Sequence, residues 1–454
     1  MVHTFIYDNE YFALDVETGS VHIVDKAAHD AIAALAQTAQ SGGDVRAQIV
    51  QSGDPVFAEI GALAREGLLF SQEAQELKQG DTNVGPGGPA ETGLGGVIKA
   101  MCLHLAHDCN LRCDYCFAQG GAFAGRREMM SAATAKAAID FLVEASGTRR
   151  NLEVDFFGGE PLMNFGVLKE TVAYARGMED KHGKHFRFTV TTNAYRITDE
   201  MIAYLDENMS NIVISIDGRP HVHDSHRVTV GGSGSYARVV QNAKKLTGNR
   251  DGEYYIRGTF TADNLDFAND VLHVADLGFA GVSIEPVVTT GSGAIEEKHL
   301  PAIFAEYERL GKEYVRRRKA QNGFTFFHFM VDLDAGPCRQ KRIRGCGAGT
   351  EYVAVAPGGD IYPCHQFVGQ QKYLMGSVFE KKLNEGIAQK FADCDIYHME
   401  KCVGCWAKYY CSGGCAAANE NISGDMYVPY DIGCAMQKKR LELAIGMAAA
   451  EQME

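Results

Sequence analysis

Short apolar runs separated by polar, turn-forming segments begin the chain. This pattern predicts a meander of three antiparallel strands. Two segments with helical periodicity come next, at 27–39 and 55–65, and Asp54 precedes the second as an N-cap with Pro55 at the first helical position. The predicted strands are 5–7, 11–14 and 21–24. Three strands followed by helices predict a small winged-helix-like module over residues 1–78.

A different alternation governs residues 97–320, where strand-like runs and amphipathic helical segments follow one another. Six such units imply a parallel sheet, because parallel strands need a crossover that is usually a helix. Eight units would close a full barrel, so six predict an open, partial barrel with its site at the carboxyl ends of the strands. The predicted strands are 97–105, 152–157, 186–191, 211–215, 253–260 and 281–285, and the clearest helices are 131–144 and 266–277.

The segments around the barrel have simpler patterns. Residues 79–96 contain seven glycines and two prolines, which is typical of a linker. At the end of the barrel, 312–319 is a basic run on a predicted helix, interpreted as a solvated face, with the gripping of an acidic peptide as the alternative. A bridging segment, 321–337, includes an extended apolar run at 324–329.

Length and charge limit the classes of function. A chain of 454 residues that is 46% hydrophobic has room for two or three domains with their own cores. The net charge of −14 argues against a nucleic-acid enzyme, and residues 1–78, with twelve acidic and four basic residues, favour a peptide partner over DNA. No signal sequence, lipidation motif or apolar span of membrane length is found, so we expect a cytoplasmic protein without membrane contact.

Thirteen cysteines in a reducing compartment indicate metal or redox chemistry rather than disulfides. Cys109, Cys113 and Cys116 fall at i, i+4 and i+7 just after the first barrel strand. A zinc site would need two Cys-x-x-Cys pairs or added histidines, and a thioredoxin-like centre needs one pair. The triplet instead suits an iron–sulfur cluster with one iron free of protein ligands, although an ordinary ferredoxin-type site is an alternative. With Tyr115 and Phe117 beside the last pair, this stretch resembles radical S-adenosylmethionine (SAM) enzymes.

Residues at the other strand ends strengthen this resemblance. After the second strand, Gly158-Gly159-Glu160 offers close backbone approach and a carboxylate, and it matches the motif by which radical SAM enzymes hold the methionine amino group. The resemblance assigns small polar side chains at the next two strand ends to ribose hydroxyls and the methionine carboxylate, and the sixth strand end to adenine. These residues are Thr192, Asn193, Ser215, Asp217, Ile284 and Glu285. The implied mechanism is electron transfer from the cluster into SAM, cleavage to methionine and a 5'-deoxyadenosyl radical, and hydrogen abstraction from an unactivated carbon.

Nine further cysteines lie in the tail, between residues 338 and 435, before a predicted terminal helix at 436–454. Their spacing resembles the SPASM domain of radical SAM peptide maturases, with a zinc ribbon as the alternative. The resemblance implies two auxiliary 4Fe-4S clusters. The outer cluster would be held by Cys402, Cys405, Cys411 and Cys434, and the inner cluster by Cys346, Cys364, Cys415 and Cys338. Cys338 is the loosely spaced member, and an open inner iron is the alternative. Cys394 and Cys102 fall outside every motif and are expected to be small buried side chains.

The whole chain is similar to maturases of six-cysteine (SCIFF) peptides, which link cysteine sulfur to a carbon of another residue. The segments 336–347 and 362–367 and the front module carry this similarity. The position and pattern of 1–78 resemble a peptide-recognition element, with a purely structural N-terminal cap as the alternative. Sulfatase-maturing enzymes are the rival, but they place an acidic residue where this chain has His365. A non-catalytic iron–sulfur electron-transfer protein is a third hypothesis, for which the strand-end residues would have no use.

The sequence thus predicts an α/β fold: a partial (β/α)6 TIM-like barrel with an N-terminal winged-helix-like peptide-recognition module and a C-terminal Cys-rich SPASM domain. The expected cofactors are three 4Fe-4S clusters and SAM. The expected partners are a Cys-rich precursor peptide, bound through its leader by the N-terminal module, and an electron donor such as flavodoxin or ferredoxin.

Overall fold

The computed structural model describes residues 1–72, 97–123, 125, 127–248, 250, 252–333, 342–380 and 383–452. Its chain divides into two units, each assembled from segments far apart in sequence. Unit 1 comprises Met1–Asp81, Leu300–Gly345 and Asp395–Glu454, and unit 2 comprises Thr82–His299 and Cys346–Cys394. The Cys-rich tail is therefore shared between the two units.

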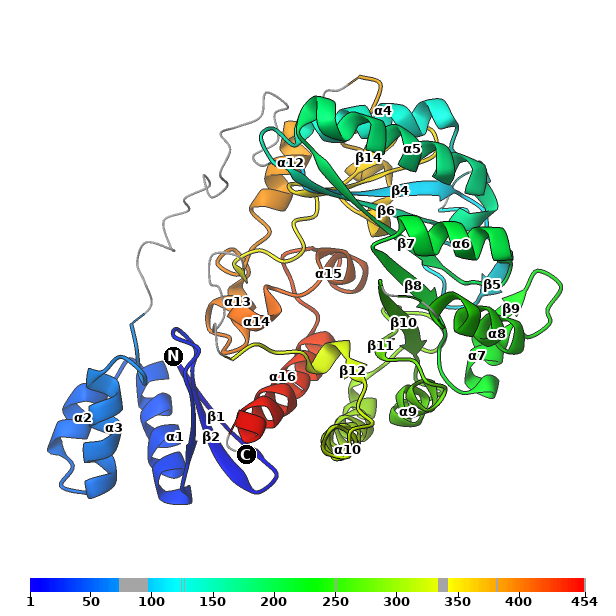
Figure 1. The fold of residues 1–454 in the computed structure, drawn as a ribbon. Helices are drawn as coiled ribbons and strands as arrows, with labels where there is room; N and C mark the ends of the chain where they lie inside the picture. Colours follow the sequence, from blue (N-terminus) through cyan, green and yellow to red (C-terminus); the bar gives the residue numbers. More distant parts are fainter. Residues whose placement is uncertain are drawn as a thin grey trace. The chain divides into compact units, whose positions relative to one another are not determined.

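The first part of unit 1 is a three-stranded antiparallel sheet with helices on one face (Figure 1). Its strands, β1 (Val2–Tyr7), β2 (Glu10–Asp15) and β3 (Val21–Val24), confirm the predicted meander. The predicted helices are present as α1 (Lys26–Gln40) and α3 (Pro55–Arg65), and Asp54 caps α3 as expected. The seven-residue helix α2 (Val45–Gln51) was not predicted, because two turns are too short to show helical periodicity.

The rest of unit 1 is mainly helical. Its elements are α10 (Leu300–Lys319), β12 (Thr325–Phe326), α13 (Glu400–Val403), α14 (Lys408–Cys411), α15 (Ala416–Ser423) and α16 (Asp431–Gln452). The prediction of an extended run at 324–329 is wrong beyond β12, where Phe327–Phe329 forms a 3-10 turn. Phe326 and Phe329 are both buried and stand three residues apart, a spacing that suits a helical turn better than a strand.

Unit 2 is a mixed α/β structure built on a parallel sheet. The strands lie side by side in the order β11-β10-β8-β7-β6-β4, and every adjacent pair is parallel. They are β4 (Ala100–Ala106), β6 (Asn151–Gly158), β7 (His185–Thr192), β8 (Asn211–Ser215), β10 (Glu253–Phe260) and β11 (Gly281–Pro286). All six match predicted strands within three residues at each end. The sheet is consistent with the expected partial barrel.

Helices connect successive strands and cover one face of this sheet, as Figure 1 shows for α4, α5 and α6. Apolar side chains on that face, such as Val154 and Phe156 of β6, are fully buried, whereas Glu153 on the opposite face is exposed. The connecting helices are α4 (Ala132–Ala145), α5 (Phe165–His182), α6 (Asp199–Asn208), α7 (Pro220–His226), α8 (Tyr236–Thr247) and α9 (Ala268–Asp276), and unit 2 also contains α12 (Glu385–Ala392) in the tail.

Part of the tail extends the barrel sheet, which the sequence did not predict. β13 (Tyr352–Val355) pairs in parallel with β4, and β14 (Asp360–Tyr362) and β15 (Gly376–Ser377) continue the sheet with antiparallel pairs. Cys364 lies two residues after β14, and unit 2 contains it together with Cys346 and Cys394, so three tail cysteines share a unit with the cysteine triplet.

Candidate functional site

The cysteine triplet lies just beyond the carboxyl end of β4. Cys109 is in the loop, Cys113 ends the short strand β5 (Leu111–Cys113), and a turn with a hydrogen bond from Cys116 N to Cys113 O (3.3 Å) leads to the third thiol. β5 pairs antiparallel with β9 (Arg227–Thr229), so that Cys113 stands opposite Arg227. This small sheet holds the otherwise irregular cysteine loop.

Glycines allow a close backbone contact between the triplet loop and the loop that follows β6. Gly158 has φ +129°, and Gly159 N donates to Ala106 O at 2.8 Å. A Cβ on Gly159 would come within 2.2 Å of Asp108 O, and one on Gly121 within 2.8 Å of Asp108 C. The two predicted glycines therefore serve a close approach between two backbones of the protein, and Gly121 is a third participant that sequence reasoning missed.

Glu160 is a buried carboxylate with three donors around it. Thr192 Oγ1 donates to Oε1 at 2.8 Å, Asn193 N donates to Oε2 at 2.8 Å, and Leu162 N donates to Oε1 at 3.0 Å. Burial nevertheless raises the pKa of Glu160 to about 7, against the lowering effect of these hydrogen bonds. A cation bound beside this carboxylate would stabilise its charged form, as the amino group of a ligand would do.

Asn193 joins the end of β7 directly to the cysteine loop. Its Nδ2 lies 3.5 Å from Cys109 Sγ and donates to Asn110 Oδ1 at 2.8 Å, while its Oδ1 accepts from Tyr195 N at 2.9 Å. The structure thus brings together four predicted residues from three strand ends, namely Cys109, Glu160, Thr192 and Asn193.

A second buried network joins the cysteine loop to the end of β8. Tyr115 OH donates to Asp217 Oδ2 at 2.5 Å, and Arg227 Nε donates to the same oxygen at 2.9 Å. Thr259 N donates to Asp217 Oδ1 at 3.0 Å, and the Arg227 guanidinium carbon is 5.6 Å from the centre of the Tyr115 ring. The hydrogen bonds described for the Asp217 carboxylate thus all come from other residues of the chain. Sequence reasoning missed Arg227, because no local pattern marks a residue that acts through a strand pairing.

The other predicted strand-end residues lie along the same edge without joining these networks. Ser215 ends β8 and aligns with Arg257 of β10. Ile284 is fully buried on the helix-covered face of β11, and the next residue, Glu285, accepts from Arg257 Nη2 at 2.8 Å.

Two thiols of the triplet, those of Cys109 and Cys113, are uncharged unless a cation binds them. Burial raises the pKa of Cys109 to about 12 and that of Cys113 to about 11, and the neighbouring charge of Glu160 adds to the effect at Cys109. Among the described residues, no three His, Cys, Asp or Glu side chains converge closely enough for one metal ion. A 4Fe-4S cluster has a different requirement, since each thiolate binds its own iron. Three free, partly buried thiols, one of them (Cys109) beside Asn193, fit such a cluster, whose positive irons would deprotonate them.

Aromatic rings and histidines line the sheet face next to the triplet. Phe117 and Phe157 lie 5.8 and 5.0 Å from His365, and Phe157 lies 5.6 Å from His104. Burial lowers the pKa of His365 to about 4 and that of His104 well below its usual value, so both rings are neutral at pH 7. Sequence reasoning missed His104, because a single polar residue inside an apolar strand carries no signal of a functional site.

The tail cysteines divide between the units. The four residues proposed for the outer cluster, Cys402, Cys405, Cys411 and Cys434, all belong to unit 1. Of the inner set, Cys346 and Cys364 belong to unit 2 and Cys415 to unit 1, and Cys338 lies outside the described residues. Both ligand assignments stay predictions. Cys102 is buried as expected, whereas Cys394 is partly exposed because it follows the last turn of α12.

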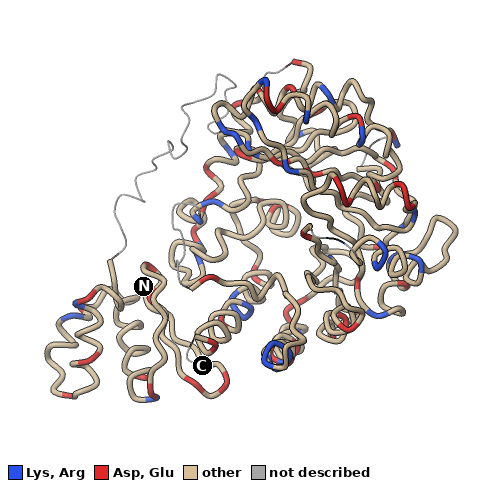
Figure 2. Tube along the Cα trace, viewed as in Figure 1, with Lys and Arg blue, Asp and Glu red and all other residues tan. Residues whose placement is uncertain are grey.

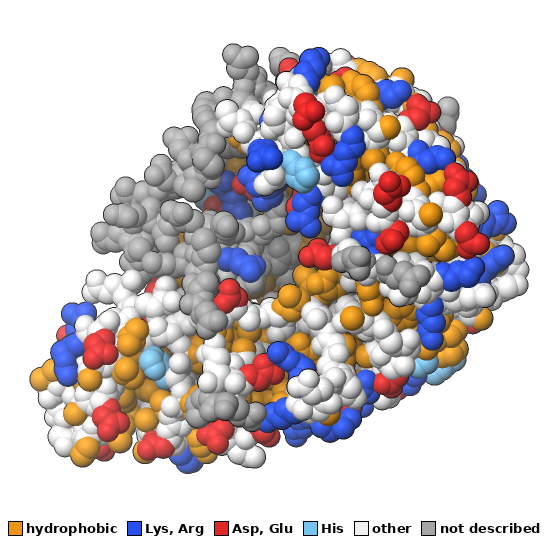
Figure 3. Space-filling model, viewed as in Figure 1, with side chains coloured by type: hydrophobic (Ala, Val, Ile, Leu, Met, Phe, Trp, Pro, Cys, Tyr) orange, Lys and Arg blue, Asp and Glu red, His pale blue; other side chains and the backbone are white. Residues whose placement is uncertain are grey.

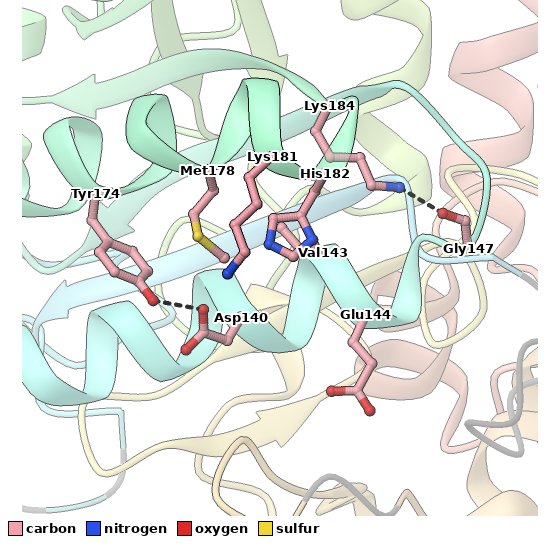
Figure 4. Close-up of a pocket in the computed structure, with 9 residues that line it drawn as sticks. All are labelled: Asp140, Val143, Glu144, Gly147, Tyr174, Met178, Lys181, His182 and Lys184. Carbon is pink, nitrogen blue, oxygen red and sulfur yellow. Dashed lines mark hydrogen bonds between the residues drawn. The ribbon is translucent and has the colours of Figure 1, made fainter.

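A hollow between α4 and α5 lies at the opposite edge of the sheet. Figure 4 shows Tyr174 pointing toward Asp140, and Lys184 reaching Gly147, with Nζ donating to its carbonyl at 2.6 Å. Gly147 and Lys184 precede β6 and β7, so this hollow is at the amino ends of the strands. Its lining combines apolar side chains with polar ones, of which Tyr174 and Lys184 are hydrogen-bonded to Asp140 and to backbone, and the cysteine triplet is at the other end of the same strands.

The predicted basic run lies at the end of α10, where Figure 2 shows a concentration of Lys and Arg. Glu313 accepts from Arg316 Nη2 at 2.6 Å and from Arg317 Nε at 2.7 Å, and Arg318 pairs with Glu451 at 3.3 Å. These pairs agree with a solvated helix face. Charged side chains of both signs are interspersed with apolar ones on the surface drawn in Figure 3. Within the described part of the chain, no helix has the length and apolar content to cross a membrane.

Comparison with known proteins identifies the barrel region. Residues 103–256 match the Radical SAM superfamily. The chain is 22% identical over 341 residues to a cysteine-type anaerobic sulfatase-maturating enzyme of Clostridium novyi, covering 71% of this chain and 89% of that protein. It is 25% identical over 335 residues to the mycofactocin maturase MftC of Mycobacterium ulcerans, covering 71% and 85%.

Solved structures share the fold at low sequence identity. A structure of anSMEcpe with bound AdoMet aligns with a TM-score of 0.67 and 17% identity over 79% of this chain and 96% of that chain. SuiB of Streptococcus suis bound to its precursor peptide SuiA aligns with a TM-score of 0.53 and 15% identity over 95% and 98%. The second alignment extends to nearly the full length of both chains.

Proposed function

Because residues 103–256 form a radical SAM domain, we propose that the chain is a maturase that forms thioether cross-links within a ribosomally made, Cys-rich precursor peptide. The observation that carries this proposal is the junction of the triplet loop with Glu160 and Asn193, at the carboxyl edge of a parallel sheet. An electron carrier or scaffold would have no use for a buried carboxylate and an amide beside three free thiols.

The chain's own residues would bind and orient the cofactors. Cys109, Cys113 and Cys116 would hold a 4Fe-4S cluster, and Glu160 would accept the amino group of SAM. When bound, cluster and SAM supply reductive cleavage and a hydrogen-abstracting 5'-deoxyadenosyl group. Asn193 donates toward Cys109, and Tyr115 is held by Asp217, so both fix the cysteine loop.

Thioether formation requires two further functions that the tail would provide. A bond between sulfur and carbon replaces one S–H and one C–H bond, so two protons and two electrons leave the peptide. The 5'-deoxyadenosyl group from SAM would remove one hydrogen atom, the inner auxiliary cluster would take the remaining electron, and the remaining proton would leave to solvent. Cys346, Cys364, Cys415 and Cys338 are its proposed ligands, and a flavodoxin or ferredoxin is the proposed donor to the triplet cluster.

The relatives support a peptide substrate. MftC is named a maturase, and the structure of SuiB bound to its precursor peptide aligns over 95% of this chain. An exposed sheet edge can accept an extended peptide as an added strand. We propose that the N-terminal module binds the leader of the precursor peptide, and that the substrates are SCIFF peptides.

A second candidate is a formylglycine-forming enzyme, which the match to the Clostridium novyi protein favours. His365 argues against it, because burial keeps this ring neutral where the sulfatase-maturing enzymes carry an acidic residue. Incubation with a Cys-containing sulfatase peptide distinguishes the two functions. An aldehyde product would establish the second, and a mass loss of two hydrogens per bridge in a Cys-rich precursor would establish the first.

The proposal is tested by reconstitution and iron analysis. We expect about twelve irons per chain, and Ala at Cys109, Cys113 and Cys116 together should remove about four of them and all 5'-deoxyadenosine formation. Cys394→Ala is the matched control and should keep all irons, since this cysteine is outside the proposed ligand sets. Loss of about four irons from Cys338→Ala would make Cys338 an inner ligand, whereas a full iron content would favour an open inner iron. 5'-deoxyadenosine formation by the triple variant would refute the assignment of the triplet.

A further inference from the structure

The N-terminal sheet of unit 1 has two covered faces. One face packs on α1–α3, in a core that includes Ala13, Ile32 and Ile60. Phe12 and Leu14 lie in a second core with Ile445 and Ala449 of α16. Trp406 and Tyr410 pack against this second core, and both belong to the segment of the proposed outer-cluster cysteines. The N-terminal sheet therefore packs directly against the segment that carries the proposed outer-cluster cysteines.

An aromatic stack connects the first strand to this segment. The His3 ring lies 3.9 Å from the Trp406 ring, and the two planes differ by 4°. His3 Nε2 is also 3.0 Å from Glu442 Oε1 of α16. Trp406 follows Cys405 directly and is the only tryptophan of the chain. Its position next to a proposed ligand is thus determined partly by a residue of β1.

A buried ion pair makes a second connection. Glu17 Oε1 is 3.5 Å from Lys408 Nζ, and Tyr409 OH donates to Glu17 Oε2 at 3.2 Å. Glu17 and Lys408 are only 4% and 3% exposed, and Tyr409 is fully buried. Breaking a buried pair by removing one partner leaves an uncompensated charge, which is far more costly than the loss of a surface pair.

Glu17 is held rigidly on its own side of the contact. Asp15, which is fully buried, accepts from Glu17 N at 3.1 Å and from Thr18 N at 3.0 Å through Oδ1. Its Oδ2 accepts from Ser71 N at 3.0 Å, beyond α3. The turn that carries Glu17 is therefore fixed to both ends of the N-terminal module.

Lys408 and Tyr409 lie between two of the proposed ligands. Lys408 N donates to Cys405 O at 3.2 Å, and Cys411 N donates to Ala407 O at 2.8 Å. Burial raises the pKa of Cys411 to about 11, and the electrostatic effects of Cys434 and Cys405 add to this shift. Free thiols that interact in this way fit a cluster site.

We propose that Glu17 is a positioning residue for the outer auxiliary cluster: it holds Lys408, and with it the Cys405–Cys411 loop, and the Glu17–Lys408 pair sets the local charge that the cluster experiences. This inference rests on the proposed function, because it takes the outer cluster from that assignment. A charge inside the protein acts over longer distances than a charge in water, so the two halves of the pair should have opposite effects on the ease of reduction.

The test is a redox titration of the reconstituted full-length enzyme followed by electron paramagnetic resonance. Glu17→Gln keeps an acceptor for Tyr409 but removes the negative charge beside Lys408, so the midpoint potential of the outer cluster should shift to more positive values. Lys408→Met should shift it to more negative values, and the double variant should return it close to the original. Glu10→Gln removes an exposed carboxylate from β2 and should change nothing.

Loss of the outer cluster from either single variant, with recovery in the double variant, would equally support the inference, because only pairing explains the recovery. Loss from all three variants would show that the pair merely supports the fold, and would overturn it. Retention of every cluster with unchanged potentials would also overturn it. If the original enzyme shows no tail cluster at all, the ligand assignment fails first, and this inference fails with it.

Discussion

At the scale of single residues, Glu160 sets a pH window for cofactor binding. Its pKa is raised to about 7 by burial, and the ammonium group of SAM would bind the ionised carboxylate. We expect SAM affinity to fall about tenfold per pH unit below pH 7 and to level off above it, since one proton must leave before binding. Calorimetric titration of the reconstituted enzyme with SAM between pH 6 and 8.5 measures this dependence.

Glu160→Gln is the control for that titration. The neutral amide should bind SAM weakly at every pH, because it offers no charge to the ammonium group. Equal affinity of the original enzyme at pH 6 and pH 8 would contradict the assigned role of Glu160.

Asn193 should influence the redox potential of the triplet cluster. Its amide donates toward Cys109 Sγ, and hydrogen bonds to the sulfurs stabilise the more negative, reduced cluster. Asn193→Ala should lower the midpoint potential by on the order of 40 mV, equivalent to roughly 1 kcal/mol for one electron. Asn269→Ala, at a half-buried position of α9, is a suitable control. An unchanged potential would mean that the amide does not face the bound cluster.

At the scale of structural elements, the glycine contacts between two loops determine whether the site can form. Gly159→Ala would place a Cβ 2.2 Å from the backbone oxygen of Asp108, which neither loop can avoid by rotating a side chain. We expect SAM cleavage to be lost and the melting temperature to drop. Gly177→Ala is the matched control, because the new Cβ meets nothing within 4 Å and alanine favours the α5 helix by about 1 kcal/mol.

Thermal unfolding and 5'-deoxyadenosine formation, measured on both variants, separate these outcomes. Full activity of Gly159→Ala would show that the two loops can move apart without harm to the site.

At the scale of the whole molecule, the N-terminal module should be needed for peptide binding and for the outer cluster, but not for SAM cleavage. Deleting residues 1–72 removes Glu17, which pairs with Lys408, and uncovers apolar side chains of α16. We expect weaker binding of the leader peptide and a loss of about four irons per chain. Cleavage of SAM without peptide should persist, because the triplet and the strand-end residues lie in unit 2.

Iron analysis and a peptide-binding assay on the truncated protein check this expectation. A full iron content would show that the module is an independent cap, and an unchanged peptide affinity would place leader recognition elsewhere.

Local patterns in the sequence were sufficient for most elements of the fold. Each of the six parallel strands was found from its own apolar run, since burial on the helix-covered face imposes that run on the strand itself. The triplet and Gly158-Gly159-Glu160 were found for a similar reason, because their spacing or composition is a local property. Helix α2 and the 3-10 turn at Phe327–Phe329 were missed where the segments were too short for a periodic signal.

The partners of these residues were decided only by tertiary structure. Tyr409 and Glu17 stand 392 positions apart, and Asp217 meets Tyr115 across 102 positions. No local pattern encodes such contacts, because they depend on how the chain closes its sheets and returns its helices. The sequence determined which residue types stand at the strand ends. Only the folded chain shows that Arg227 pairs with Cys113, that β13 extends the barrel sheet, and that the N-terminal sheet shares a core with α16. The reason is that each of these contacts joins segments that are far apart in the sequence.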